Sequence, residues 1–283
     1  MIKVLVTGAN GQLGLCLRDQ IQNSPDTVCV FASRKTLDIT NTAQIETLFI
    51  ENNFDYCINT AAYTNVDKAE SEQQTVFLIN AEGAANISEA CKKYQVTLIH
   101  ISTDYVFDGS KKSPYLETDI TNPINVYGAS KLKGEQHIKE TLDKHFILRT
   151  SWLYSQYGHN FFNSMLRFAK EKKELTITTE QTGTPTNAND LAKAIVDIIV
   201  AKNTRYGTYH YSNSGEATWY NFAKAIFEIT GEIDNLSLAK TDHYPTFAKR
   251  PLYSVMDCAK IITNTSVTLT DWKISLEKLI KNN

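Results

Sequence analysis

Residues 4–14 read VLVTGANGQLG, an apolar run that leads into a glycine-rich turn and the start of a helix. The glycines, Gly8, Gly11 and Gly14, have the spacing GxxGxxG. Glycine there permits positive φ in the turn, close approach of a diphosphate and tight packing of helix on strand. A helix that opens near Gly11 offers free N–H groups and the positive end of its dipole to an anion. A tight turn without a ligand is the alternative, but a position at the first strand–helix junction favours a dinucleotide site.

Strand and helix patterns alternate through the first half of the chain. The sequence predicts strands over Ile2–Thr7, Thr27–Ala32, Tyr56–Asn59, Val96–Ile101 and Phe146–Thr150. It predicts helices over Gln12–Gln22, Ala43–Glu51 and Glu82–Lys93, near Ser71–Asn80, and from after Pro123 to Leu142. Strands separated by helices pair in parallel with right-handed crossovers. We therefore expect an α/β fold with a Rossmann-type, doubly wound parallel sheet.

The alternation of strand and helix patterns changes after about residue 150, where aromatic clusters appear between the helices. We expect residues 1–150 to form an NAD(P)-binding Rossmann domain. Residues 151–283 are expected to form a smaller, substrate-binding α/β part, interleaved with elements that return to the first domain.

Composition excludes several classes of protein. The 283 residues (31.9 kDa) are 42% hydrophobic and 21% charged, with a formal net charge of -2. This balance gives no basic field for nucleic acid, and no apolar run approaches the ~20 residues that cross a bilayer. Met1 leads straight into a strand-like run, so we expect no secretory segment and a cytoplasmic protein.

The cysteines and histidines give no sign of a disulfide or a metal site. Five cysteines lie scattered on apolar segments: Cys16, Cys29, Cys57, Cys91 and Cys258. We expect reduced thiols in the core. No CxxC, HxH or HExxH cluster occurs, so the spacing predicts no metal ligands.

The turn after the second predicted strand bears on cofactor preference. An acidic residue there would bind the ribose 2′-hydroxyl of NAD, whereas this chain has Ser33-Arg34-Lys35. Cationic side chains attract a 2′-phosphate, so NADPH is expected and NADH stays open; a solvated loop is the alternative. Asp38 and Ile39 are placed to flank the adenine ring. The small Ala61 and Ala62 leave room beside the cofactor.

A tyrosine and a lysine lie at i and i+4 on the helix after Pro123. In Tyr127-Gly128-Ala129-Ser130-Lys131 the two side chains share one helix face, and the small residues between them are expected to leave that surface open. A nearby ammonium favours the phenolate, so we expect Lys131 to lower the pKa of Tyr127. A surface pair is the alternative. Ser102 and Thr103 follow the predicted strand Val96–Ile101, at the carboxyl end where such sheets bind ligands, and a hydroxyl there is placed to bond a substrate carbonyl oxygen beside Tyr127.

Several longer stretches carry a family resemblance. They are TGANGQLG (7–14), NTAAYTNVDKAE (59–70), STDYVFDG (102–109), NVYGASKLKG (125–134) and RTSWLY (149–154), with weaker matches at QTGTPT (181–186) and Arg250-Pro251. In these stretches the chain resembles the extended short-chain dehydrogenase/reductase superfamily and, within it, the dTDP-4-dehydrorhamnose reductases. The late loop, residues 250–254, departs from the family pattern, because Tyr253 stands where members often have Asn.

The resemblance implies a reaction and roles for individual residues. The implied reaction is NADPH-dependent reduction of the C4 ketone of dTDP-4-dehydro-β-L-rhamnose, the last step of dTDP-rhamnose biosynthesis. Tyr127 would be the proton donor, Lys131 would orient the nicotinamide ribose, and Thr103 would complete the triad. The implied cofactor positions are Gly11, Gln12, Leu13, Asp38, Ile39, Ala61, Ala62 and Thr64. Thr103, Asp104 and Trp152 would touch the sugar nucleotide, although Asp104 as a turn cap and Trp152 as plain core are the alternatives.

Other functions stay open or are disfavoured. A dehydratase would have Thr-Asp-Glu, but Tyr105 occupies the Glu position, and a 4-epimerase lacks a stretch like STDYVFDG. A talose-forming reductase would use the same residues, and a non-catalytic binding subunit could share the fold. The resemblance also implies Mg²⁺ and a homodimer, for which no carboxylate cluster or surface is assigned.

Overall fold

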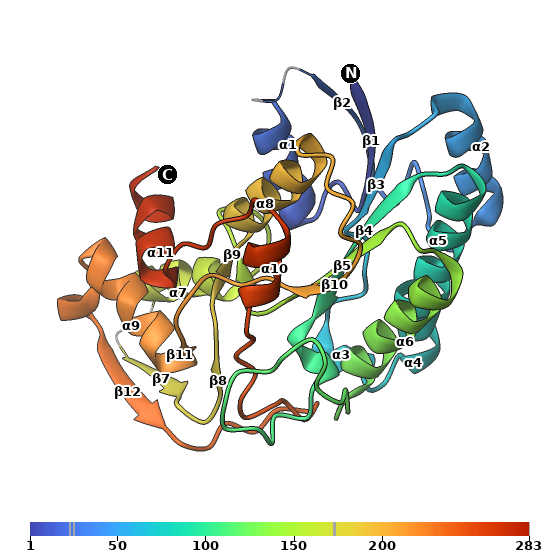
Figure 1. Ribbon diagram of the computed structural model, residues 1–283. Coiled ribbons are helices and arrows are strands. Elements are labelled where there is room, and N and C mark those ends of the chain that lie inside the picture. The colour runs from blue at the N-terminus through green and yellow to red at the C-terminus, as the bar shows by residue number, and fades with distance from the viewer. Residues whose placement is uncertain (23, 25, 172–173, 283) are drawn as a thin grey trace.

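A six-stranded parallel sheet forms the centre of the computed structural model, which describes residues 1–22, 24, 26–171 and 174–282 (Figure 1). The spatial order is β10-β5-β4-β3-β1-β2. The strands are β1 (Ile2–Thr7), β2 (Thr27–Ala32), β3 (Tyr56–Asn59), β4 (Thr97–Thr103), β5 (His145–Thr150) and β10 (Gly207–His210). All neighbours pair in parallel, so the expected Rossmann-type fold is confirmed.

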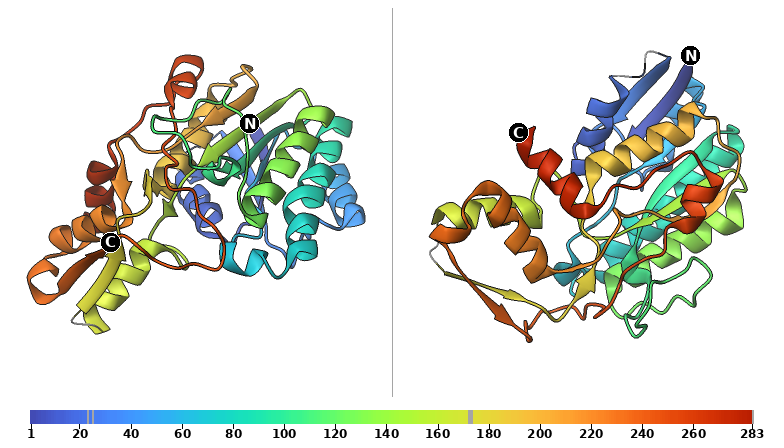
Figure 2. Two further views of the ribbon diagram at one scale, coloured as in Figure 1. Left: turned by 90° about the horizontal axis from the view of Figure 1, so that it is seen from below. Right: turned by 60° about the vertical axis from the view of Figure 1, so that its left-hand side comes forward.

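Helices cover both faces of this sheet (Figures 1 and 2). One face carries α1 (Gln12–Ile21) and α8 (Ala188–Val200), and the other carries α2 (Thr42–Asn52), α5 (Gly83–Lys93) and α6 (Val126–Thr141). Successive strand residues point to opposite faces, so Val4 and Val6 pack beneath α1 and α8 while Leu5 packs on the other side. Burial on both faces explains why β1 is apolar throughout instead of alternating.

The two helices expected around residues 71–93 form one continuous run. It consists of α4 (Gln73–Phe77), a π-helical turn (Leu78–Glu82) and α5. The widened turn buries Asn80, whose side-chain amide accepts from Tyr63 N at 2.8 Å and donates to Ser130 Oγ at 3.0 Å. Asn80 therefore ties the loop after β3 to α6, and no helix boundary is needed there.

Helix α6 packs very closely on its neighbours. Its N-cap is Asn125, whose side chain accepts from Gly128 N at 2.7 Å. A Cβ atom at Gly128 would lie 2.1 Å from Tyr105 O, and one at Gly134 would lie 2.3 Å from Asn80 O. The sequence predicted that the small residues on this face leave the surface open. At Gly128 this prediction is wrong, because the position is filled by a neighbouring segment of backbone. The glycine lets the helix that carries Tyr127 pack directly against backbone.

The second half of the chain builds a smaller lobe to one side of the sheet (Figure 2). Its elements are β6 (Leu153–Tyr154), α7 (Phe161–Glu171), β7 (Glu174–Thr178), β8 (Thr182–Gly183), β9 (Thr186–Asn187), β11 (Ala217–Thr218), α9 (Trp219–Thr230), β12 (Ser237–Thr241) and α11 (Trp272–Lys281). Helix α10 (Ala259–Asn264) packs instead on β10 and the core of the sheet. The lobe has its own core, centred on Tyr154, Phe222 and Trp272. Between these elements the chain returns to the sheet as α8 and β10.

Candidate active site

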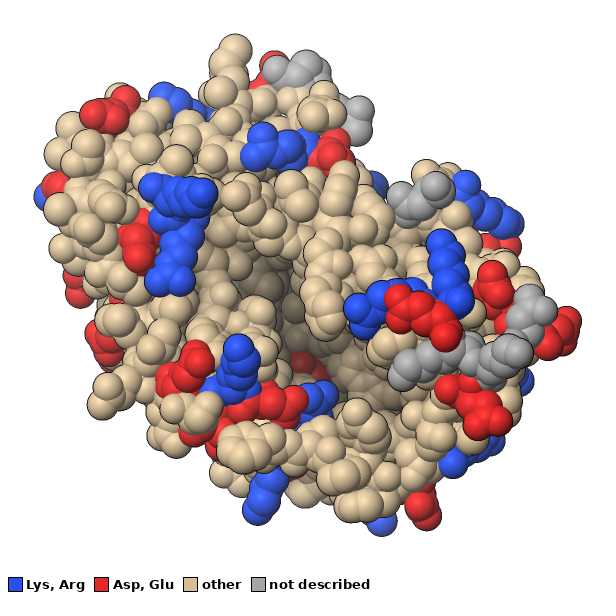
Figure 3. Space-filling model, turned by 180° about the vertical axis from the view of Figure 1, so that it is seen from behind, with Lys and Arg blue, Asp and Glu red and all other residues tan. Residues whose placement is uncertain are grey.

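A cavity of about 730 Å³ opens at the carboxyl ends of β1, β3, β4 and β5. The strand order reverses between β1 and β3, and ligands of open parallel sheets bind at such a point. In Figure 3 the cavity is a hollow bordered mostly by uncharged residues. Apart from Gly14, the residues that the sequence predicted for the site all line it: Gly8, Gly11, Gln12, Leu13, Arg34, Asp38, Ile39, Ala61, Ala62, Thr64, Thr103, Asp104, Tyr127, Lys131 and Trp152.

The glycine-rich turn fits a diphosphate. Gly8 has φ +64°, and a Cβ atom there would lie 2.7 Å from Ala61 N. Gly11 caps α1 without a side-chain hydrogen bond, and the first turn of the helix holds no acidic residue. The first amides of α1 are therefore available to an anion. Gly14 does not line the cavity because it packs on Ala9. A Cβ atom at Gly14 would lie 2.7 Å from Ala9 Cα.

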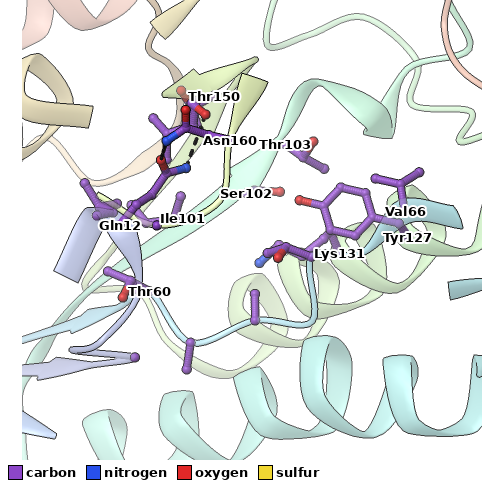
Figure 4. A pocket seen from close by; sticks show the side chains of 18 of the residues that line it. Gln12, Thr60, Val66, Ile101, Ser102, Thr103, Tyr127, Lys131, Thr150 and Asn160 are labelled. Carbon is purple, nitrogen blue, oxygen red and sulfur yellow. Dashed lines mark hydrogen bonds between the residues drawn. The ribbon is translucent and has the colours of Figure 1, made fainter. Parts of the chain in front are cut away.

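The side chain of Gln12 joins the two halves of the molecule. Its Nε2 donates to Leu153 O at 3.2 Å, and its Oε1 accepts from Ser155 Oγ at 3.3 Å and from Asn160 Nδ2 at 3.2 Å (Figure 4). These bonds occupy the amide, so the side chain holds the phosphate turn against the second half of the chain. The main chain of Gln12 is what remains for a cofactor.

Arg34 and Asp38 form the rim at the end of β2. The Arg34 side chain is 80% exposed, and its Nε lies 3.8 Å from Asp38 Oδ2. Asp38 accepts hydrogen bonds from the backbone N and Oγ1 of Thr40, which lower the pKa of its carboxyl. Asp38 is therefore fixed within the chain, while the exposed guanidinium of Arg34 is accessible from solvent.

Tyr127 and Lys131 point into the same part of the cavity from α6 (Figure 4). Burial raises the pKa of Tyr127 to about 12, although hydrogen bonding with Thr103 acts in the opposite direction. The sequence predicted a lowered pKa, and for this structure the prediction is wrong. Desolvation of the phenol outweighs the hydrogen bond with Thr103, and the nearby Asp104 carboxyl raises the pKa further, so Tyr127 is protonated at neutral pH.

The amine of Lys131 is directed at a residue that the sequence analysis missed. Its Nζ lies 3.2 Å from Nε2 of His100 on β4, and desolvation lowers the pKa of Lys131 to about 8. A histidine inside the buried apolar run of β4 was the available signal. Such a residue needs polar partners in the core.

Thr103 and Asp104 stand at the end of β4, opposite Tyr127. Thr103 Oγ1 donates to Asp104 Oδ1 at 3.1 Å, and Tyr105 N donates to Thr103 Oγ1 at 3.1 Å. Asp104 is 2% exposed, and its Oδ2 has no hydrogen-bond partner among the described residues. Burial raises the pKa of Asp104 to about 6. The site thus holds a carboxyl group that titrates near neutrality.

Trp152 forms an aromatic wall rather than plain core. Its ring stacks on Trp219, with ring centroids 3.6 Å apart and an angle of 6° between the ring planes. Phe161 packs on Trp219 in turn, at a centroid distance of 4.6 Å. Its backbone is left-handed, at φ 45°, and a Cβ atom at Gly183 would lie 2.7 Å from the indole. Trp219 and Phe161 also line the cavity. The sequence showed them only as members of aromatic clusters.

Arg250 contributes a cation to the cavity wall. Its Nη2 pairs with Asp67 Oδ2 at 2.9 Å, and Ala248 N donates to Asp67 Oδ1 at 3.1 Å. The sequence analysis quoted Arg250 without giving it a role. The pair joins the stretch around residue 67 to the late loop, so each fixes the other at the cavity.

A buried ion pair between Glu135 on α6 and Arg149 on β5 supports the site. Glu135 accepts from Arg149 Nε at 2.9 Å and Nη2 at 2.7 Å, and from Ser102 Oγ at 2.6 Å. These partners hold the pKa of Glu135 at about 2 despite full burial. The network fixes the strand end that carries Thr103 to the helix that carries Lys131.

The fold and this site define a dinucleotide-binding protein of the extended short-chain dehydrogenase/reductase class. The family model described as RmlD substrate binding domain matches residues 2–283. A dTDP-4-dehydrorhamnose reductase of Sinorhizobium fredii is 39% identical, over 99% of this chain and 97% of its own. One from Escherichia coli is 41% identical, over 80% and 79%. The Bacillus anthracis enzyme, solved with NADP, is 38% identical with a TM-score of 0.95, covering 100% of both chains. The chain therefore belongs to the RmlD substrate binding domain family, which confirms the resemblance found in the sequence.

Three further findings concern the part of the chain that the structure describes. No helix in it is both long enough and apolar enough to cross a bilayer. It contains no group of three or more His, Cys, Asp or Glu side chains placed to bind a metal ion. The five cysteines are free, and all but the half-buried Cys29 are buried.

Proposed function

We propose that this chain catalyses the NADPH-dependent reduction of the C4 ketone of dTDP-4-dehydro-β-L-rhamnose to dTDP-L-rhamnose. The convergence of Tyr127, Lys131 and Thr103 on one cavity with the glycine-rich turn carries this proposal. Relatives that share almost the full length of the chain and bear the name dTDP-4-dehydrorhamnose reductase support the choice of substrate.

The cofactor is proposed to lie along residues 1–150. The amides at the start of α1 are available for the diphosphate, and Arg34 for a 2′-phosphate. The NADP in the Bacillus anthracis structure supports NADPH over NADH. The sugar nucleotide is proposed to lie against residues 151–283, where Trp152 offers an aromatic face. Arg250 lines the cavity and offers a cation to its diphosphate.

The reaction needs a proton donor and a means of stabilising negative charge. NADPH, when bound, supplies the hydride for C4. Tyr127 is protonated at neutral pH and gives its hydroxyl proton to the ketone oxygen as charge develops there. The Thr103 hydroxyl bonds the same oxygen, and the ammonium of Lys131 stabilises the phenolate that remains. A raised phenol pKa suits the donor in the resting protein, because the proton is present before substrate arrives.

An NADPH-oxidation assay with dTDP-4-dehydrorhamnose, followed by NMR of the product, tests the function. Tyr127→Phe should lower kcat by about a hundredfold or more while NADPH affinity is retained, since only the proton donor is removed. Tyr115→Phe is the matched control, because Tyr115 is buried outside the cavity. Unchanged kcat in Tyr127→Phe would remove Tyr127 from the mechanism.

The same assay separates the other functions. A talose product would identify the 4-epimeric reductase. Absence of NADPH oxidation, with copurification of a partner protein, would identify a binding subunit. A homodimer and a cytoplasmic location are likewise proposed from family membership, and light scattering of the purified protein tests the dimer. Mg²⁺ likewise rests on the family resemblance alone, and activity in EDTA tests whether the protein needs it.

A further inference from the structure

A chain of buried polar side chains runs from Lys131 away from the cavity and into the sheet. Lys131 Nζ lies 3.2 Å from His100 Nε2, and His100 Nδ1 lies 3.1 Å from Asn59 Nδ2. Asn59 Oδ1 lies 2.7 Å from Thr7 Oγ1. All four residues are at most 2% exposed. The chain therefore connects the lysine of the site to the residue that precedes the glycine-rich turn.

The carboxylate one turn along α6 is not the partner of Lys131. Glu135 is occupied by Arg149, Ser102 and Lys139, and it acts on Lys131 only at a distance. Among the described residues, His100 is the side chain that Lys131 Nζ contacts within hydrogen-bond distance. A buried ammonium needs an acceptor, and the imidazole supplies it.

The imidazole must be neutral to accept that bond. Burial, together with Lys131 and with His145 on β5, lowers the pKa of His100 well below its usual range. A neutral imidazole has one donor and one acceptor nitrogen. When Lys131 donates to Nε2, the ring proton is on Nδ1, and Asn59 must turn its oxygen toward it. As placed, Asn59 points Nδ2 at His100 Nδ1, and its Oδ1 accepts from Thr7 Oγ1. The two ends of an amide are equivalent in shape, so exchanging them lets Asn59 accept from Nδ1 and donate to Thr7 Oγ1 over the same distances.

We propose that His100 is a positioning residue for Lys131: its Nε2 accepts one of the three ammonium N–H groups and directs the other two into the cavity. An ammonium on a flexible stem rotates freely unless one donor is fixed. The two remaining donors suit the adjacent hydroxyls of a ribose. Only the identification of that ribose as the one next to the nicotinamide of NADPH rests on the proposed function.

The first experiment uses the unaltered protein without cofactor. Long-range ¹H–¹⁵N NMR of histidine-labelled protein at pH 7 should show His100 as a neutral ring protonated at Nδ1. The resonance is assigned by its absence from His100→Gln. A ring protonated at Nε2, or a charged ring, would overturn the proposal. This readout depends neither on turnover nor on the folding of a variant other than the one used for assignment.

The second experiment compares two amide variants of similar polarity. In His100→Asn the shorter side chain reaches Asn59 but not Lys131, whereas in His100→Gln the longer one reaches Lys131 with its oxygen. NADPH affinity, measured by tryptophan quenching at pH 7, should fall about tenfold in His100→Asn, the loss of one bond to a charged group. His100→Gln should retain affinity within about twofold, because the acceptor is restored. Equal affinities in the two folded variants would overturn the proposal, and melting temperatures establish that both are folded.

Failure of this proposal and failure of the proposed function are distinguishable. If the unaltered protein does not reduce dTDP-4-dehydrorhamnose, yet the NMR and affinity results are as expected, the substrate is wrong and His100 keeps its role. If turnover is normal and His100 is protonated at Nε2, the function stands and the positioning role is refuted.

Discussion

Removing the buried carboxylate beneath the site should destabilise the protein strongly. Glu135 is fully buried and bonds Arg149 through two hydrogen bonds of 2.9 and 2.7 Å. Glu135→Gln keeps the shape but leaves the Arg149 charge, itself only 2% exposed, without a counterion. Breaking a buried pair on one side costs about 3–5 kcal/mol. At about 2.1 cal/mol/K of unfolding entropy per residue, this corresponds to a fall in Tm of about 5–8 °C for a chain of this length.

An exposed pair of the same chemistry is the matched control. Lys224 and Glu228 on α9 approach to 3.3 Å, with their side chains 48% and 51% exposed. Glu228→Gln should cost no more than about 0.5 kcal/mol, since solvent screens the pair. Free energies of unfolding in urea at pH 7.5 give the comparison. A cost for Glu135→Gln within about 1 kcal/mol of the control would refute the account of the buried network.

The loss of unfolding free energy in Glu135→Gln should also depend on pH, and it should become smaller on acidification. The pKa of Glu135 is lowered from 4.5 to about 2 on folding, so its contribution is fully present above pH 4.5. It is lost as the pH falls through the folded value of about 2. The difference between unaltered protein and Glu135→Gln should therefore be constant from pH 5 to 8 and shrink below about pH 4.5. A difference that grows on acidification would contradict this reasoning.

Three further predictions concern Arg34 at the rim, the aromatic wall of Trp152 and the buried carboxyl of Asp104. Arg34→Ala should weaken NADPH binding more than NADH binding, as Arg34 is the exposed cation at the rim; equal losses in fluorescence titrations would remove its role. In Gly183→Ala the new Cβ would lie 2.7 Å from the Trp152 ring, and displacing it costs about 1–3 kcal/mol. We expect a raised KM for the sugar nucleotide with unchanged NADPH affinity; a change in NADPH affinity alone would place Trp152 on the cofactor side. Folding raises the pKa of Asp104 from 3.8 to about 6, so the protein loses stability as pH rises through this window. Asp104→Asn should then be more stable at pH 7.5, by up to about 3 kcal/mol, and no more stable below pH 3.8. Equal urea midpoints at pH 7.5 would count against the buried charge.

The parts of the site that the sequence predicted are those encoded by local spacing. The strand, the glycine-rich turn and the helix over residues 2–21 lie where the pattern placed them. Tyr127 and Lys131 share a helix face because four residues make about one turn. The end of β4 carries Thr103 into the same cavity because parallel strands present their carboxyl ends at one edge.

Other parts depend on contacts between segments far apart in the sequence. Gln12 meets Asn160 across 148 positions, and Arg250 meets Asp67 across 183. The aromatic stack likewise pairs Trp152, which follows β5 of the central sheet, with Trp219, the first residue of α9. Neither residue type nor periodicity reports such distances, because the partners meet only when the second half of the chain packs against the sheet.

The sequence by itself determined the doubly wound fold and the positions of the glycine-rich turn, the phenol and the ammonium, since these follow from periodicity and short spacings. The tertiary structure decided how those groups behave. Only packing shows that Lys131 Nζ contacts His100 and that burial raises the pKa of the Tyr127 phenol. The physical reason is that protonation depends on burial and on neighbours from other strands, and both exist only in the folded molecule.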